Sequence, residues 1–211
     1  MKRTAFTFPE LTMAAAITCL IGLAVAGAAS SLSYAYNQTQ NMSELLQSQR
    51  VAMSNMERVL RTGKLVVAVI PGGLIVWQGD ANVNGSIDLN ELVKIEFDSA
   101  NHQIVQESLP GLATGLNPKL TLASANNYST TKTSMDSAIR STYMKSAVLA
   151  TNVRGFEVKT NAASPLTTVV LIRVTTSQGT ESVTVTNSIA LRADSTGAVT
   201  YTHNVPILCL N

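Results

Sequence analysis

Cysteine is scarce in this sequence, with Cys19 inside an apolar run and Cys209 near the C-terminus. A bridge between them would have to draw Cys19 out of its apolar surroundings, because bonded cysteines need Cα atoms within about 7 Å of each other. We therefore expect two free thiols and no disulfide framework.

Histidine is also scarce, and nucleotide-binding motifs are missing. His102 and His203 are the only histidines, and neither has the Ser, Cys or Asp neighbours typical of a catalytic triad or a zinc site. No G-x-x-x-x-G-K-[ST] phosphate loop occurs in the sequence. These absences predict that the protein is not an enzyme.

Charge is low as well: 13% of the 211 residues are charged and the net charge is +2. No global field therefore exists to attract nucleic acid. Hydrophobic residues make up 45% of the chain, and Ser, Thr and Asn fill much of the remainder, as in many β-rich domains outside the cytoplasm. The length suits one anchor helix and one globular domain, because domains commonly have about 100–150 residues.

What the sequence does have is a long uncharged run near its N-terminus. No charged residue occurs from Leu11 to Ser30, and ~20 helical residues cross the roughly 30 Å hydrocarbon core of a membrane. Lys2 and Arg3 precede the run, which places the N-terminus in the cytoplasm by the positive-inside rule. The alternative is a secretory signal cleaved around Ala26–Ala28, but such a signal has no use for the Glu10 carboxylate.

A distinctive segment, Phe6-Thr7-Phe8-Pro9-Glu10-Leu11, follows the basic pair and opens the apolar run. It resembles the cleavage and methylation motif of the type IV prepilin and pseudopilin family. The resemblance implies that a prepilin peptidase cuts between Ala5 and Phe6 and methylates Phe6, and that Glu10 contacts a neighbouring subunit's N-terminal amine. Ala5 replaces the family's usual Gly, and Pro9 suits the first turn of a helix.

The physical chemistry of Glu10 agrees with this resemblance. A lone carboxylate in lipid is unfavourable until a second subunit supplies a positive amine at the same depth, so Glu10 would set the register of assembly. The alternative is a glutamate that reaches the membrane interface and interacts favourably with the helix dipole.

The pattern becomes amphipathic beyond Tyr34 and Tyr36, which suit a membrane interface. We expect a transmembrane helix over residues 6–36 that continues as an amphipathic helix over residues 37–63 and stops at Gly63. Core packing is the favoured role for its methionines, and a soft surface for changing partners is the alternative. The apolar stripe consists of Met42, Leu46, Gln49, Met53, Met56 and Leu60.

We expect a β-rich head over residues 64–211, because β-branched residues and turn signals dominate that part of the sequence. Asp98–Asn101 is expected to form a hairpin turn, and Ser134–Ala147 a short helix. The stretch Asn152–Val158 and the long hairpin after it are similar to J-type minor pseudopilins of type II secretion. The expected strands are Leu65–Ile70, Gly73–Gln78, Leu92–Phe97, His102–Glu107, Val153–Lys159, Thr167–Thr176, Glu181–Arg192 and Val199–His203.

The sharpest local motif runs from Asp80 to Glu91 and fits the calcium-loop pattern D-x-[DN]-x-[DN]-G-x₅-E. Strand-like flanks and two Asn ligands predict weak affinity, as in extracellular calcium modules. The alternative is a hairpin turn at Asn84-Gly85. The ligands would be the side chains of Asp80, Asn82, Asn84, Asp88 and Glu91 and the carbonyl of Ser86.

Together the patterns predict the α+β fold of a pilin-like subunit: a leader at residues 1–5 and a long helix packed on an antiparallel β-sheet head. We expect a single-pass protein of the bacterial inner membrane with a periplasmic head. The favoured function is a minor pseudopilin of a type II secretion filament. The alternatives are a minor pilin of a type IV pilus or DNA-uptake filament, or a non-polymerising calcium-binding tether. Expected partners are prepilin peptidase and other pilin-type subunits, without nucleic acid.

Overall fold

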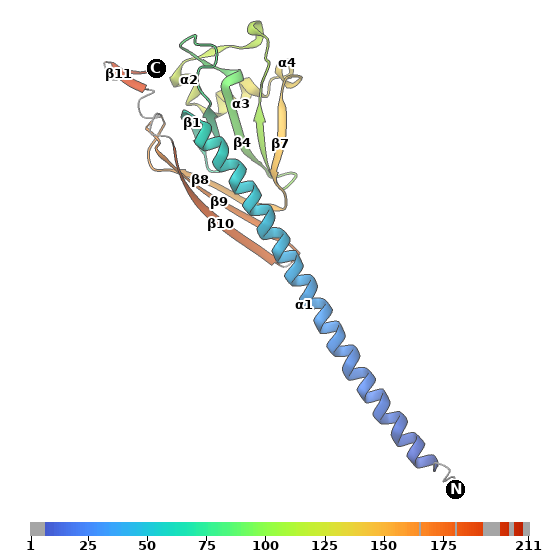
Figure 1. The fold of residues 1–211 in the computed structure, drawn as a ribbon. Coiled ribbons are helices and arrows are strands. Elements are labelled where there is room, and N and C mark those ends of the chain that lie inside the picture. The colour runs from blue at the N-terminus through green and yellow to red at the C-terminus, as the bar shows by residue number, and fades with distance from the viewer. Residues whose placement is uncertain (1–6, 165, 180, 192–198, 203–204, 209–211) are drawn as a thin grey trace. The chain divides into compact units, whose positions relative to one another are not determined.

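The computed structural model describes residues 7–164, 166–179, 181–191, 199–202 and 205–208. It confirms the expected α+β fold, a long N-terminal helix packed on antiparallel sheets (Figure 1). Contacts divide the chain into two units, residues 1–44 and 45–211. The expectations for Ala5, Phe6, His203 and Cys209 lie outside the described residues.

Helix α1 extends from Phe8 to Thr62 without interruption. Pro9 lies in its first turn, where a missing N–H has no intrahelical acceptor to lose. The helix ends where Gly63 passes so close to Val76 that a Cβ on Gly63 would overlap the valine side chain. The predicted stop at Gly63 is confirmed, and the close approach of Val76 explains why a glycine occupies this position.

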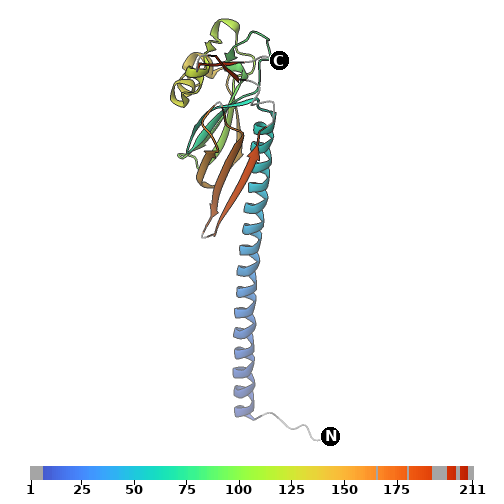
Figure 2. The same cartoon turned by 90° about the vertical axis from the view of Figure 1, so that its left-hand side faces the viewer.

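The strands of the head form two main antiparallel sheets. One has the order β1-β2-β4-β5-β7 and the other the order β10-β9-β8. Figure 2 shows the second sheet beside the last turns of α1. Their strands are β1 (Leu65–Ile70), β2 (Gly73–Trp77), β4 (Leu92–Asp98), β5 (Gln103–Ser108), β7 (Lys145–Ala150), β8 (Val153–Thr160), β9 (Val169–Gln178) and β10 (Glu181–Ala190).

Shorter elements complete the head. Two small strand pairs, β3–β6 and β11–β12, lie outside the main sheets. These elements are β3 (Ile87–Asp88), β6 (Lys119–Leu120), β11 (Val199–Thr202), β12 (Val205–Leu208), the 3₁₀ helices η1 (Leu89–Glu91) and η2 (Thr114–Leu116), and the helices α2 (Leu122–Ala125), α3 (Tyr128–Met135) and α4 (Ala138–Ser141).

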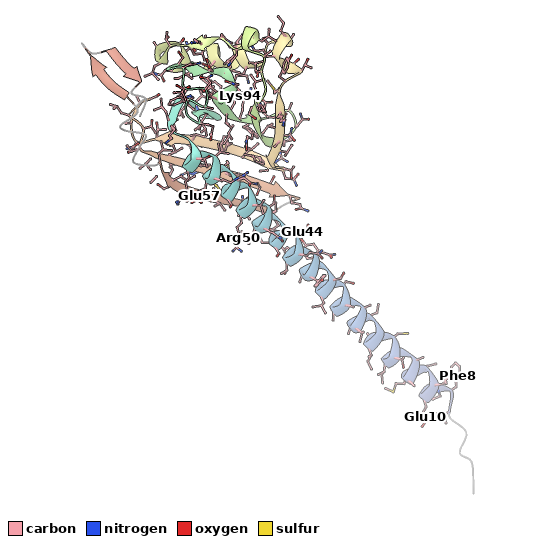
Figure 3. The ribbon with its side chains drawn as sticks, turned by 45° about the horizontal axis from the view of Figure 1, so that its top comes forward. Phe8, Glu10, Glu44, Arg50, Glu57 and Lys94 are labelled. Atoms are coloured by element: carbon pink, nitrogen blue, oxygen red, sulfur yellow. The ribbon has the colours of Figure 1, made fainter. Side chains whose placement is uncertain are left out.

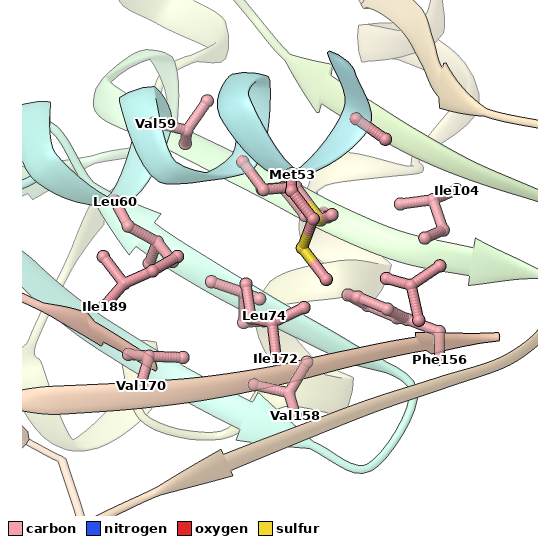
Figure 4. Packing of buried hydrophobic residues seen from close by; sticks show 14 of the residues in the cluster. Met53, Val59, Leu60, Leu74, Ile104, Phe156, Val158, Val170, Ile172 and Ile189 are labelled. Carbon is pink, nitrogen blue, oxygen red and sulfur yellow. The ribbon is translucent and has the colours of Figure 1, made fainter. Parts of the chain in front are cut away.

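The core between α1 and the two sheets follows from the alternation of side chains along the strands. Figure 4 shows Met53 and Leu60 projecting from α1 toward Leu74 of the first sheet and toward Ile172 and Ile189 of the second. Met53 and Met56 are core residues, as expected, because they are 6% and 0% exposed. Met42, earlier in the same stripe, is only half-buried.

The first sheet is also covered on its other face. Alternate residues of β1 and β2 point away from α1 into a second cluster with side chains of η1, α2 and α3. Trp77 belongs to this cluster and is 3% exposed, so it is a core residue.

The helix predicted over Ser134–Ala147 is wrong in its extent. Only Ala138–Ser141 of that range forms a new helix, α4, while Lys145–Ala150 forms strand β7. Strand β7 pairs antiparallel with β5, about 40 residues earlier in the chain. A partner this distant supplies backbone hydrogen bonds that local periodicity does not report.

Candidate functional site

The carboxylate of Glu10 lies in the first turn of α1 (Figure 3). Its Oε2 accepts hydrogen bonds of 2.9 Å from both the backbone N–H and the hydroxyl of Thr7. A negative charge at this position also interacts favourably with the positive end of the helix dipole. Within the described residues, the hydrogen bonds recorded for Glu10 come only from Thr7, and Glu10 has no cationic partner.

Apolar side chains surround the helix beyond Glu10. Every side chain from Thr7 to Gln40 is exposed within this chain. Leu11, Met13, Leu20 and Leu23 are between 62% and 71% exposed, whereas a helix on the surface of a soluble domain exposes mainly one polar face. The helix is long and apolar enough to cross a membrane.

The few polar residues of the apolar run satisfy their own hydrogen bonds. The hydroxyl of Thr18 donates to the Ala14 carbonyl at 2.8 Å, and that of Ser30 donates to the Ala26 carbonyl at 2.8 Å. Cys19 is free and exposed, as expected. A side chain that bonds within its own helix does not need water, so these residues are compatible with lipid.

The second candidate site is the loop from Asp80 to Glu91, between β2 and β4. The two oxygens of Asp80 accept the N–H groups of Asn84 and Gly85 at 3.0 and 2.7 Å. Burial by itself raises the pKa of the Asp80 carboxyl, but the N–H groups of Gly85 and Asn84 hold that pKa below its ordinary value. Gly85 has φ = 78°, the left-handed conformation that glycine adopts most easily.

The side chains of the loop converge on Asp88. Its Oδ2 accepts the Nδ2 groups of Asn82 and Asn84 at 2.6 and 2.7 Å. Asp88 is only 2% exposed, and its Oδ1 is buried without a hydrogen-bond partner in the described part of the chain. Ser86 contributes its N–H to the Oδ1 of Asn84 at 2.8 Å. The structure thus brings the side chains of Asn82, Asn84 and Asp88 together.

Glu91 has different partners from those expected of a calcium ligand. Its Oε2 accepts the indole N–H of Trp77 at 2.9 Å and the N–H of Asp88 at 3.3 Å, and its Oε1 accepts the N–H of Ala81 at 2.8 Å. Among the described residues, no three His, Cys, Asp or Glu side chains form a metal-binding group. The sequence signature locates the loop, but the role of Glu91 depends on Trp77, which lies outside the signature.

The sequence did not predict a charged cluster that forms around Lys94. Figure 3 labels Lys94, which lies on β4. Its Nζ lies 2.7 Å from both Asp136 Oδ1 and Glu107 Oε2 and 3.3 Å from Glu96 Oε2. Lys132 forms a second ion pair with Glu96. The alternation of β4 offered one signal, since Lys94 shares its inward-facing register with Leu92. Its pairing with Asp136 depends on the tertiary fold.

The 2% exposure of Lys94 makes this cluster a structural anchor between β4, β5 and the end of α3. His102 is exposed beside the Asp98–Asn101 turn. Strands β4 and β5 pair up to Asp98 and Gln103, which confirms the predicted hairpin turn. Hydrogen bonds from the side-chain and backbone N–H groups of Asn101 hold the Asp98 carboxylate in this turn and lower its pKa.

Comparison with protein-family models, curated proteins and solved structures finds no match for this chain.

Proposed function

We propose that this protein is a filament subunit of the type IV pilin and pseudopilin kind. Residues 6–36 anchor it in the bacterial inner membrane, with the N-terminus in the cytoplasm and the head, residues 64–211, in the periplasm. A prepilin peptidase cuts between Ala5 and Phe6 and methylates Phe6. The subunit then joins or primes a periplasmic filament, and a J-like minor pseudopilin of type II secretion is the favoured version.

The observation that carries this proposal is the position of Glu10. Its carboxylate opens a helix that is apolar on all sides, and Thr7 gives it hydrogen bonds but no positive charge. An ionised carboxylate next to lipid is costly, about 3 kcal/mol at the centre of a membrane helix and less toward its ends. The terminal amine of another subunit is a cation that can reach the same depth, so pairing favours assembly.

The exposed apolar surface of α1 supports the same function. A single helix gains little from lipid beyond insertion, whereas helices of neighbouring subunits can pack against one another along it. Association through this helix leaves the opposite end of the chain, the β-sheet head, available for contacts outside the membrane. This division of roles suits a subunit that polymerises through its anchor.

The test is substitution of Glu10 by Ala or Gln in the full chain, in its native membranes, followed by crosslinking to sister subunits. Both variants should insert normally, because removing a charge favours lipid, but they should crosslink at least tenfold less. Glu44→Gln is the matched control, because Glu44 is an exposed glutamate of the same helix beyond the apolar run. Unchanged crosslinking in both Glu10 variants would favour a non-polymerising tether.

The minor pilin of a type IV pilus or DNA-uptake filament is the alternative filament subunit. Both versions use the same anchor and the same carboxylate, so the Glu10 variants do not separate them. Co-purification from solubilised membranes does: type II secretion components retained with this chain support the favoured version, and pilus components support the alternative.

A further inference from the structure

We propose that the loop from Asp80 to Ser86, together with Asp88, binds one calcium ion through the side chains of Asp80, Asn82, Asn84 and Asp88 and the carbonyl of Ser86. The site uses residues of the head alone, so it is independent of the assembly role proposed for Glu10. The unpartnered oxygen of Asp88 and the convergence of Asn82 and Asn84 on that residue carry this proposal.

Asp88 supplies the observation that points to a cation. Its side chain is 2% exposed, and its Oδ1 makes no hydrogen bond in the described residues. The capping box at the start of η1 turns the Asp88 side chain toward the backbone N–H of Glu91 without forming a side-chain cap hydrogen bond. A buried carboxylate oxygen without a donor is costly, because it has lost its water without gaining a partner. A divalent cation at the loop supplies the missing interaction.

Asn82 and Asn84 can complete the ligand set with little movement. Their Nδ2 groups now lie 2.6 and 2.7 Å from the Oδ2 of Asp88. Because the oxygen and nitrogen of an Asn amide share one carbon, turning each amide about its last side-chain bond presents an oxygen in place of the nitrogen. Turning Asn84 removes the acceptor of the Ser86 N–H, and turning Asn82 removes one acceptor of the Asn84 N–H. Both losses are costs that weaken affinity.

Oxygen ligands of this kind select calcium, which accepts six to eight carboxylate, amide and carbonyl oxygens in flexible geometry. Asp80 and Asp88 supply two negative charges, fewer than in high-affinity loops. The affinity expected for such a loop is that of extracellular modules, with a Kd of about 10⁻⁴ to 10⁻³ M.

Glu91 stabilises the proposed site through hydrogen bonds and is not one of its ligands. Its two oxygens accept N–H groups from Trp77, Ala81 and Asp88, so the glutamate ties the start of the loop to the residue on which the ligands converge. Trp77 is the only tryptophan of the chain, and its hydrogen bond to Glu91 places an intrinsic fluorophore next to the site.

The experiment uses terbium, a luminescent substitute for calcium that tryptophan excites at short range. The detergent-solubilised full chain is titrated with terbium under excitation of Trp77, and calcium or magnesium is then added as competitor. Asp80→Asn and Asp88→Asn remove the charged ligands while keeping side-chain size. Asp98→Asn is the control, because Asp98 also accepts backbone N–H groups in an exposed turn.

The unsubstituted chain and Asp98→Asn should show terbium luminescence that calcium abolishes and an equal concentration of magnesium leaves largely intact. Asp80→Asn and Asp88→Asn should each lose at least tenfold of that signal. Without terbium, calcium between roughly 0.1 and 10 mM should raise the melting temperature of the unsubstituted chain only. Absence of a calcium-sensitive signal, its retention in both loop variants, or equal displacement by magnesium would overturn the proposal.

Discussion

Replacing Lys94 by Met should destabilise the head strongly, because three carboxylates depend on this one buried ammonium group. Lys94 is 2% exposed, whereas Glu107, Glu96 and Asp136 are 22%, 23% and 37% exposed. Met fills the volume of the lysine stem, so the substitution removes charge with little change in packing. The three carboxylates then lie close together without the cation that holds them there.

The expected loss of stability is about 3 kcal/mol. Breaking a buried ion pair by removing one partner costs roughly 3–5 kcal/mol, and the partial exposure of the three carboxylates lets water offset some of that loss. For a domain of this size, about 3 kcal/mol corresponds to a fall in melting temperature of roughly 6–12 °C. The fluorescence of Trp77, in the core on the same side of the sheet, reports the transition.

Lys159→Met is the matched control. Lys159 pairs with Glu157 at 2.7 Å but is 63% exposed, and an exposed ion pair contributes only about 0–1 kcal/mol. A loss of stability in Lys94→Met no larger than in Lys159→Met would refute the anchoring role of Lys94.

The same prediction has a pH dependence. Burial by itself lowers the pKa of Lys94, but Asp136 and Glu107 outweigh burial and raise that pKa above its ordinary value of 10.5. The stabilisation by Lys94 is therefore fully present below the unfolded-state pKa and is lost as pH rises through the folded-state pKa. The difference in stability between the unsubstituted chain and Lys94→Met should be constant from pH 7 to 9 and shrink above about pH 10.5.

Two further substitutions test the packing of the head by thermal melting. Tyr128→Phe should raise stability by up to about 1 kcal/mol, because the buried Tyr128 hydroxyl has no hydrogen-bond partner in the described residues; a loss above 1 kcal/mol would show a hidden partner. Met56→Ala should cost about 2–5 kcal/mol through the cavity it leaves at a fully buried position. Met13→Ala, at a 70% exposed position of the same helix, should leave the melting of the head unchanged, and an equal effect in both would contradict the assigned core.

Much of the fold could be predicted because its signals are local. The strand expected over Leu65–Ile70 has the same bounds in the structure, and β4 differs from its prediction by one residue, Asp98. Both follow from β-branched and apolar runs bounded by turn residues. The last turns of α1 follow from helical spacing, since Met53, Met56 and Leu60 are all buried.

The rest depends on contacts between distant residues. Strand β7 has a sequence, Lys-Ser-Ala-Val-Leu-Ala, that suits a helix as well as a strand, and its pairing with β5 decides the outcome. The division into two sheets was not predicted either. It occurs near Asn152, where φ = 58° redirects the chain from β7 into β8 of the second sheet.

The candidate calcium loop shows the same limit at the scale of single side chains. Spacing alone identified Asp80, Asn82, Asn84 and Asp88, and the structure draws the last three together. Spacing does not encode side-chain direction, so the hydrogen bonds that occupy Glu91 could be known only from the tertiary structure.

The central claim, that this chain is a processed filament subunit, is tested most directly at the N-terminus of the mature protein. Mass spectrometry and N-terminal sequencing of the protein purified from its own membranes should find a chain that begins with N-methylated Phe6. An intact Met1 would contradict processing and leave a simple membrane anchor. A start near Ala28 would show that the apolar run is a cleaved secretory signal.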